Sequence, residues 1–385
     1  MNGRRANADH LVIGGGPAGC TVALRLAASG RRVVLVERER EACHKVCGEF
    51  LSREANHYLD QLGIAPLALG AEMIHTLRLC SGRRAAAAPL PFQALSLSRR
   101  ALDEALLTRA AEKCEVVRGV AVESLTLNGG AWIAELSDGQ SLRASAVFLA
   151  TGKHDLRGLG RPAGKQSDLI GFKIYWRLAP AQVAALRGCM DLFLFPGGYG
   201  GLSLVENEAA NLCLVVRRSV LRSLGGWNPL LADLRKANEQ LRNLLDGAQP
   251  LWLRPLAISP IPYGHLHRED DGLWRIGDQA AVIPSFTGDG VSIALHSASL
   301  AAEMYLAGCS PADFYRKLRA QLGRSMSLAT LISRAAVTAS GRAIAFTAAS
   351  LIPAIMPSVA TSTRIPEGSL LPSVRTFTPI APHSV

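Results

Sequence analysis

One stretch near the N-terminus constrains the fold of this chain more than any other. Residues 10–37 read HLVIGGGPAGCTVALRLAASGRRVVLVE. The pattern predicts a buried strand over 11–13, a helix over 17–29 and a second strand over 33–36, which together make a βαβ unit. The motif Gly14-x-Gly16-x-x-Gly19 falls in the turn from the first strand to the helix. That is the context in which a dinucleotide-binding fingerprint is expected.

Each part of this unit has a physical role in holding a diphosphate. We expect Gly14 to make the tight turn, Gly16 to let the backbone approach the diphosphate, and Gly19 to let the helix pack on the strand. The start of the helix, at Pro17 and Ala18, directs free N–H groups at the anion. Glu37 ends the second strand, where a carboxylate can accept hydrogen bonds from an adenosine ribose, and Arg38 follows it. An acid at this position favours FAD or NAD over NADP.

A second segment selects FAD. Residues 273–306 read LWRIGDQAAVIPSFTGDGVSIALHSASLAAEMYL, which predicts a strand over 273–276 and a long helix from about residue 290. This segment resembles the Gly-Asp segment of FAD-dependent hydroxylases, geranylgeranyl reductases and flavin halogenases. The resemblance implies that Asp278 binds the ribityl chain and that the later turn and helix start approach the flavin ring. The cofactor-binding candidates are therefore Asp278, Pro284, Gly288, Asp289, Gly290 and Val291.

Three shorter matches to the same superfamily lie between these segments. Arg99, in SRRALD, matches the arginine of a helix that reaches the cofactor, and Thr151 and Gly152 end a buried strand that passes the dinucleotide. The stretch HKVCGEFLS resembles the Lys-x-Cys-Gly loop of the geranylgeranyl reductase branch, which adds Lys45 and Gly48 to the cofactor candidates and makes Cys47 a candidate catalytic residue. A cysteine beside a glycine is more often a packing residue than a reactive one.

The predicted fold is α/β: an FAD-binding Rossmann-like domain of the glutathione reductase type, with an inserted mixed β-sheet substrate domain and C-terminal helices. The length of 385 residues suits such an arrangement. We assign the FAD-binding domain to 1–75, 98–165 and 265–310, the substrate domain to 76–97 and 166–264, the helical segment to 311–364 and a disordered tail to 365–385.

A glycine-rich run gives the candidate substrate contacts. Residues 195–206 read FPGGYGGLSLVE and resemble the strand that passes over the ring in reductases of this group. Tyr199 and Glu206 are the candidates for substrate contact. A surface hairpin with an ordinary tyrosine and carboxylate is the alternative.

Composition narrows the classes of partner. The net charge is +11, but the basic residues are scattered rather than gathered in a stripe, so we expect no nucleic acid. Cys43 and Cys47 have no second pair at ligand spacing, so no metal site is predicted.

The absence of a secretory pattern predicts a cytoplasmic protein. The apolar run 343–363 contains Pro353 and Pro357, which favours a surface that touches a membrane over a span.

Several functions remain open from the sequence. The Trp-x-Trp-x-Ile-Pro motif of flavin halogenases is absent. Monooxygenation of a lipophilic aromatic or polyketide-like metabolite ranks slightly ahead of reduction of an isoprenoid alkene, and a non-catalytic redox sensor is a third hypothesis. No second dinucleotide motif occurs in a βαβ context, so NAD(P)H is expected to dock transiently as electron donor. The sequence does not indicate an oligomeric state.

Overall fold

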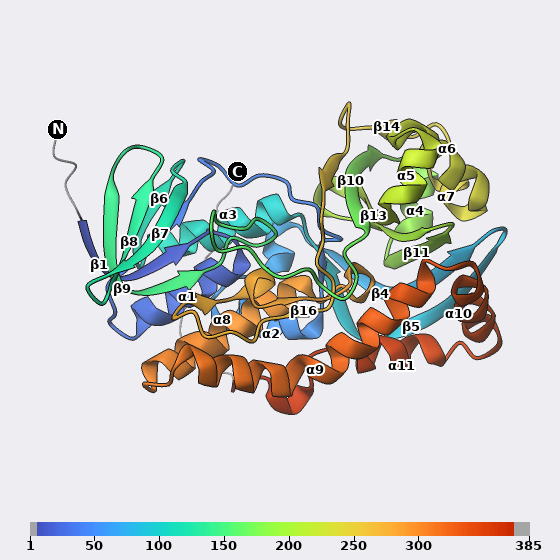
Figure 1. Ribbon diagram of the computed structural model, residues 1–385. Coiled ribbons are helices and arrows are strands. Elements are labelled where there is room, and N and C mark those ends of the chain that lie inside the picture. Colours follow the sequence, from blue (N-terminus) through green and yellow to red (C-terminus); the bar gives the residue numbers. More distant parts are fainter. Residues whose placement is uncertain (1–5, 373–385) are drawn as a thin grey trace.

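The computed structural model describes residues 6–372, which form two large sheets, a separate two-stranded sheet and the helices that join them (Figure 1). The first sheet has the order β6-β2-β1-β9-β8-β7, and β17 pairs with the end of β9. Its strands β1, β2, β6, β9 and β17 are parallel, whereas β7, β8 and β9 form an antiparallel meander. The bounds are β1 (Ala6–Ile13), β2 (Val33–Glu37), β6 (Glu115–Arg118), β7 (Val122–Asn128), β8 (Ala131–Leu136), β9 (Ser141–Leu149) and β17 (Trp274–Arg275).

Helices cover one face of this sheet and the β7–β8 hairpin covers the other. Buried apolar side chains of the helices and of β1, β2 and β9 form one continuous core, whereas Leu125, Leu136 and their neighbours form a separate core under the hairpin. The helices are α1 (Pro17–Ala28), α2 (Arg53–Gln61), α3 (Arg99–Ala111) and α8 (Gly290–Leu306). This confirms the predicted βαβ unit, whose strand–helix boundaries lie within one or two residues of those expected at α1 and β2.

The second sheet has the order β14-β10-β13-β12-β11-β4-β5-β3, with β15 paired to β10. Helices α4 to α7 cover its outer face and bury an apolar core there. The strands are β3 (Phe50–Leu51), β4 (Glu72–Ser81), β5 (Arg84–Ser96), β10 (Leu169–Arg177), β11 (Cys189–Phe195), β12 (Gly198–Leu204), β13 (Ala210–Arg217), β14 (Gln249–Pro250) and β15 (Leu256–Ile258), and the helices are α4 (Pro180–Leu186), α5 (Arg218–Leu224), α6 (Trp227–Ala237) and α7 (Glu239–Leu244).

The remaining elements link the two sheets. Helix α9 runs beneath both, and α10 and α11 lie at the end remote from β7 and β8 (Figure 1). These elements are α9 (Pro311–Ala336), α10 (Ala339–Leu351), α11 (Ile355–Ser362), the short pair β16 (His265–Leu266) and β18 (Ala281–Val282), and the 3-10 turns η1 (Pro66–Leu69), η2 (Glu206–Glu208), η3 (Gly277–Gln279), η4 (Ser285–Thr287) and η5 (Glu367–Ser369).

Two predicted boundaries need correction. The substrate sheet begins earlier than residue 76, because β4 starts at Glu72 and β3 also joins this sheet. Residues 365–372 are not a disordered tail, because Ile365 and Leu371 are buried. The backbone N–H of Leu371 donates to the Tyr58 hydroxyl at 3.1 Å, and its carbonyl is 2.8 Å from His57 Nε2. The rest of the assigned tail, 373–385, lies outside the described residues.

Candidate cofactor and active site

The glycine-rich turn between β1 and α1 has the shape that a diphosphate requires. Gly14 has φ +106°, and a Cβ there would lie 2.5 Å from the Ala150 carbonyl oxygen. A Cβ on Gly19 would lie 1.8 Å from the carbonyl oxygen of Gly14, so the helix can pack this closely only with glycine. Helix α1 starts after Gly16 at Pro17 without a side-chain cap. Its first N–H groups are therefore open to an anion.

Glu37 and Arg38 occupy different environments at the end of β2. Glu37 is buried, and its carboxylate accepts hydrogen bonds from the backbone N–H groups of Gly15, at 2.5 Å, and Glu39, at 3.0 Å. It thus lies against the glycine-rich turn, as a ribose-binding acid should, and each carboxylate oxygen retains lone pairs. Arg38 is paired with Glu39 on the surface.

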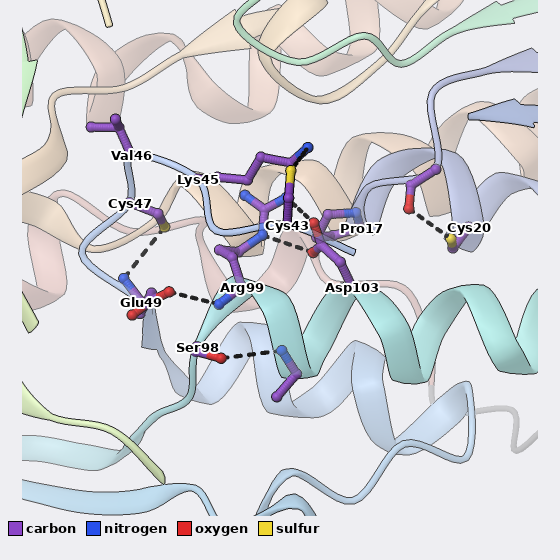
Figure 2. A network of polar contacts seen from close by, with 12 residues as sticks. Pro17, Cys20, Cys43, Lys45, Val46, Cys47, Glu49, Ser98, Arg99 and Asp103 are labelled. Atoms are coloured by element: carbon purple, nitrogen blue, oxygen red, sulfur yellow. Dashed lines mark hydrogen bonds and ion pairs between the residues drawn. The ribbon is translucent and has the colours of Figure 1, made fainter. Parts of the chain in front are cut away.

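Arg99 touches the same turn from the start of α3. Its Nη2 would lie 3.4 Å from a Cβ on Gly16, and its guanidinium forms two 2.8 Å bonds with Asp103 (Figure 2). Burial opposes the charge of Arg99, but the Asp103 carboxylate outweighs this effect and raises the pKa of Arg99 above its usual value. A fixed positive charge therefore stands beside the open end of α1, where it can meet a diphosphate.

The Lys-x-Cys-Gly loop lies next to Arg99 (Figure 2). The Cys47 sulfur accepts from the Glu49 N–H at 3.3 Å, and the Cys47 carbonyl accepts from Asn211 on β13 at 3.2 Å. Lys45 Nζ lies 3.2 Å from the sulfur of Cys43. A Cβ on Gly48 would have no neighbour within 4 Å, so the backbone of this loop borders open space.

Lys153 connects this loop to the later Gly-Asp segment. Its Nζ donates to the Val46 carbonyl at 3.2 Å and lies 3.6 Å from the Asp278 carboxylate. Gly277 in turn packs against Ala18 of α1, with 3.0 Å between the Ala18 Cβ and a Cβ placed on Gly277. The two cofactor segments predicted from the sequence thus meet in space.

The end of β9 closes the same region. Gln279 Nε2 donates to the Gly152 carbonyl at 2.9 Å, and the Thr151 hydroxyl donates to the His154 carbonyl at 2.6 Å. Because Ala150 already lies against Gly14, the Thr151-Gly152 turn, the glycine-rich turn and the Gly-Asp segment are neighbours. The glycines, the free start of α1, Arg99 and Asp278 together form a cradle that fits FAD.

Three of the candidates around the start of α8 are packed against the protein, and one borders open space. Gly288 has φ +74° and packs on the Phe50 ring. The carbonyl of Pro284 accepts a hydrogen bond from the Thr287 hydroxyl at 3.0 Å, and Val291 is buried in the core. A Cβ on Gly290 would have no neighbour within 4 Å, so this position borders open space. The cofactor role of these four residues remains a prediction.

Asp289 is the exception at this turn, because a buried cation already holds it. Its carboxylate accepts from Arg364 at 2.6 Å, and both side chains are almost fully buried. Burial raises the pKa of Asp289 to about 6, against the opposing effect of Arg364. This carboxylate therefore anchors the chain after α11 to the start of α8; a direct contact with flavin stays a prediction.

Tyr199 and Glu206 lie at opposite ends of β12 and do not form one site. Tyr199 is buried against Phe286 of η4, and its hydroxyl is 3.0 Å from the Ser333 hydroxyl on α9. Burial raises the pKa of Tyr199 to about 12. Glu206 instead accepts from the Ser98 N–H at 2.8 Å, before α3. Their roles as substrate contacts stay predictions, as does a catalytic role for Cys47.

Sequence reasoning missed a buried polar network beside Cys47. Glu49, Lys173 and Tyr175 are all buried; Lys173 Nζ forms an ion pair with one Glu49 carboxylate oxygen, and the Tyr175 hydroxyl donates to the other at 2.6 Å. The Arg99 N–H also donates to Glu49, at 2.7 Å. Two signals point to its members separately, because Glu49 follows the Lys-x-Cys-Gly motif and the alternation of β10 places Lys173 and Tyr175 on one face. Neither signal shows that Glu49 and Lys173 meet.

Burial raises the pKa values of both acidic groups in this network, the Glu49 carboxyl and the Tyr175 phenol. Burial raises the pKa of Glu49, although Lys173 and the hydrogen bonds from Tyr175 and Arg99 oppose the effect. Burial and the adjacent Glu49 carboxylate raise the pKa of Tyr175. The phenol of Tyr175 therefore keeps its proton at neutral pH and hydrogen-bonds to a group that can exchange protons with it.

Tyr175 also borders a cavity of about 560 Å³. The His44 ring packs edge-on against Tyr175 and lies 5.0 Å from the Trp252 ring, so aromatic side chains form one wall. Burial and the nearby Lys173 lower the pKa of His44 to about 4, which keeps this wall uncharged at neutral pH. Arg100, Arg177 and Glu206 are among the polar residues that line the rest.

Known proteins similar in sequence to this chain include oxidoreductases, which agrees with a cradle that fits FAD. The family described as pyridine nucleotide-disulphide oxidoreductase matches residues 8–160. The chain is 26% identical to menaquinone reductase of Mycolicibacterium smegmatis over 78% of this chain and 77% of that protein. It is 25% identical to digeranylgeranylglycerophospholipid reductase 2 of Methanopyrus kandleri, over 77% and 76%. Similarity to 6-methylpretetramide 4-monooxygenase of Streptomyces rimosus is higher, at 48%, but covers only 15% of this chain and 14% of that enzyme.

Solved structures have the same fold. A flavoprotein/dehydrogenase from Cytophaga hutchinsonii superimposes with a TM-score of 0.75 at 18% identity, over 93% of each chain. Halogenase PltM in complex with phloroglucinol and FAD superimposes with a TM-score of 0.73 at 14% identity, over 86% of this chain and 76% of that one. These likenesses confirm the predicted combination of a Rossmann-like FAD domain with an inserted substrate sheet.

Proposed function

We propose that this chain, an FAD-dependent oxidoreductase of the superfamily that includes the geranylgeranyl reductases, reduces a carbon–carbon double bond of a lipophilic isoprenoid substrate. The observation that carries the proposal is the buried network of Glu49, Lys173 and Tyr175, whose tyrosine borders the cavity. Saturation of a double bond adds a hydride to one carbon and a proton to the other, and reduced FAD supplies the hydride when bound. The protein must supply the proton.

Different residues of the chain bind the cofactor, transfer the proton and orient the proton-transfer groups. The open start of α1 and Arg99 hold the diphosphate, and Asp278 orients the ribityl chain. Tyr175 gives its O–H proton to the substrate. The tyrosinate left behind takes a proton from the Lys173 ammonium by way of the Glu49 carboxylate that bridges them, and Lys173 is reprotonated from solvent before the next turnover. Lys173 keeps Glu49 oriented. The rings of His44, Tyr175 and Trp252 form one uncharged aromatic wall of the cavity for the substrate to pack against. NAD(P)H docks transiently to restore the reduced state.

Relatives that match most of the chain also support reduction. The menaquinone reductase and the digeranylgeranylglycerophospholipid reductase each align over about three quarters of this chain. The sequence alone ranked monooxygenation slightly ahead, and the short match to 6-methylpretetramide 4-monooxygenase favours that second candidate. Because that match covers only 15% of the chain, it carries less weight than the longer matches.

An anaerobic single-turnover experiment separates these functions. The purified holoprotein is reduced chemically, oxygen is removed, and a geranylgeranyl lipid is added while flavin absorbance and product mass are followed. Reduction predicts that the flavin reoxidises and that the product gains two hydrogens. Product that forms only when oxygen is present would overturn the proposal in favour of monooxygenation. Failure of any isoprenoid to reoxidise the flavin would favour the redox sensor.

Tyr175→Phe tests the role of the network in the same assay. The variant keeps the ring that lines the cavity but has no proton to donate, so we expect reoxidation by the alkene to slow by about 10²- to 10⁴-fold. Reduction of the flavin by NAD(P)H should be unchanged, because that half-reaction does not need this proton. Equal loss in both half-reactions would indicate a structural role for Tyr175 instead.

A further inference from the structure

The C-terminal helices carry large apolar side chains on their outer surface. The exposed fractions are 76% for Leu351, 69% for Ile344 and 66% for Leu331. With Ile352 at 61% and Ile355 at 38%, these residues define what we call the apolar patch. It follows the end of α9 and the elbow between α10 and α11, at one end of the molecule (Figure 1). A surface of this kind on a folded chain usually marks a binding face.

The opposite sides of the same helices are firmly anchored. Phe346, Ala349 and Met356 are buried, and the last two pack with Ala86 and Ala88 of β5. One side of α10 and α11 is therefore packed against the protein, and the apolar patch lies on their exposed side. Within residues 6–372 no single helix is long and apolar enough to cross a membrane; the segments Ala339–Leu351 and Ile355–Ser369 reach that length only together, across a bend of 118°.

The charge around the patch indicates what covers it. Residues 314–366 contain seven Lys and Arg residues and no Asp or Glu. Two of the seven do not add free charge to the surface, because Arg364 is buried against Asp289 and Arg316 pairs with Asp313. Arg324 and Arg334 are exposed on α9, and Arg334 lies one helical turn from Leu331. Apolar side chains flanked by cations match the headgroup region of a bilayer that contains anionic lipid. A second copy of this chain would instead bring an equally basic surface against it.

Helix α9 also joins the patch to the interior of the protein. Ser333 lies on its buried side, where its hydroxyl donates to Gln166 at 2.7 Å and is 3.0 Å from the Tyr199 hydroxyl. Leu331 and Arg334, on either side of Ser333 in the sequence, are exposed. The helix that would contact lipid is therefore the one that packs against β12 of the substrate sheet.

We propose that the ends of α9, α10 and α11 dock this protein on the surface of an anionic lipid bilayer, with the elbow between α10 and α11 inserted among the headgroups. The inference is independent of the reaction that the flavin performs. It commits to a lipid surface rather than to a protein partner. Binding has two contributions, one from burial of the patch and one from the arginines, and only the second is weakened by salt.

Co-sedimentation of the holoprotein with vesicles tests the proposal. The vesicles are phosphatidylcholine with or without phosphatidylglycerol. The double variant Ile344→Asp/Ile352→Asp removes apolar contacts from the patch. The matched control is Leu127→Asp/Leu253→Asp, which adds the same two charges at exposed leucines outside the C-terminal helices. We expect the double variant to bind vesicles with phosphatidylglycerol about tenfold more weakly or worse. The control should bind like the wild type, and added salt should weaken all three.

Three results would overturn the proposal. The wild type could stay in the supernatant with both vesicle types, or the double variant could bind as tightly as the wild type. The wild type could also sediment as a dimer without vesicles, and the double variant as a monomer, which would identify a second copy as the occupant. Flavin content, measured by absorbance for each variant, shows that the fold is retained.

Discussion

Gly277 packs directly against Ala18, so the segment that carries Asp278 meets the first helix of the chain where its free N–H groups lie. Lys153 adds a second link, because it contacts both Asp278 and the Lys-x-Cys-Gly loop. These contacts bring residues from the two ends of the predicted cofactor domain into one region, the cradle described above. The cradle can therefore be tested from either side.

The first prediction concerns Gly16 at the start of α1. Gly16→Val places a branched side chain where the diphosphate must approach, 3.4 Å from Arg99 at its Cβ, so we expect the purified protein to lose its yellow colour. The measurement is flavin absorbance per mole of protein. Gly160→Val is the control, because Gly160 is exposed and a Cβ there meets nothing within 4 Å. Stoichiometric flavin in the Gly16 variant would contradict the site.

The second prediction concerns Asp278. If its carboxylate accepts hydrogen bonds from the ribityl hydroxyls, Asp278→Ala should weaken FAD binding by about 1.5–3 kcal/mol, or roughly 10- to 100-fold in Kd. The FAD affinity of Asp278→Asn should lie between those of Asp278→Ala and the wild type, because the amide oxygen of asparagine can still accept one hydrogen bond. Titration of the apoprotein with FAD, followed by flavin fluorescence, measures both. Equal affinities for all three proteins would remove Asp278 from the site.

The third prediction concerns the stability of the buried pair. Glu49→Gln leaves Lys173 buried without its counter-charge, which should lower the free energy of unfolding by about 3–5 kcal/mol. The double variant Glu49→Gln/Lys173→Met removes both charges and should recover most of that loss. Urea unfolding followed by circular dichroism compares the three proteins. If the double variant were no more stable than Glu49→Gln, the pair would not account for the loss.

Local patterns predicted the cofactor cradle well because each of its parts has a sequence signature. The Gly14, Gly16 and Gly19 spacing and the two apolar runs around α1 determine the βαβ unit within one short stretch. The Glu49 and Lys173 pair could not be predicted in this way. Its members come from a loop and from β10, and no periodicity shows that they meet.

The C-terminal segment differs from its prediction for a related reason. Residues after 364 have little periodicity, and this pattern predicts a disordered tail. Leu371 is nevertheless held by hydrogen bonds to Tyr58 and His57 of α2. Arg364, just before this segment, is fixed by Asp289 at the start of α8. Long-range contacts of this kind order a chain that local propensity leaves undefined.

The Asp289 and Arg364 contact gives the last prediction, a dependence of stability on pH. The pKa of Asp289 is raised from 3.8 to about 6 in the folded protein, mainly by burial. The folded state therefore binds this proton more tightly than the unfolded state. The stability that the group contributes is fully present below pH 3.8 and is lost as the pH rises through about 6. The expected loss is about 3 kcal/mol, from roughly 1.4 kcal/mol per pKa unit.

Asp289→Asn isolates this contribution, because asparagine has a similar shape and does not titrate. The free energy of unfolding of each protein is measured by urea denaturation at several pH values from about 4 to about 7. Carboxylates that do not contact Arg364 affect both proteins alike, so the informative quantity is the difference between them. Glu54, which lies 3.6 Å from Arg364, is the neighbouring carboxylate that also senses the substitution. The wild type should lose about 3 kcal/mol relative to the variant across this range. A difference that stays constant with pH would show that Asp289 titrates with its ordinary pKa, and that Arg364 fully offsets the burial of its carboxylate.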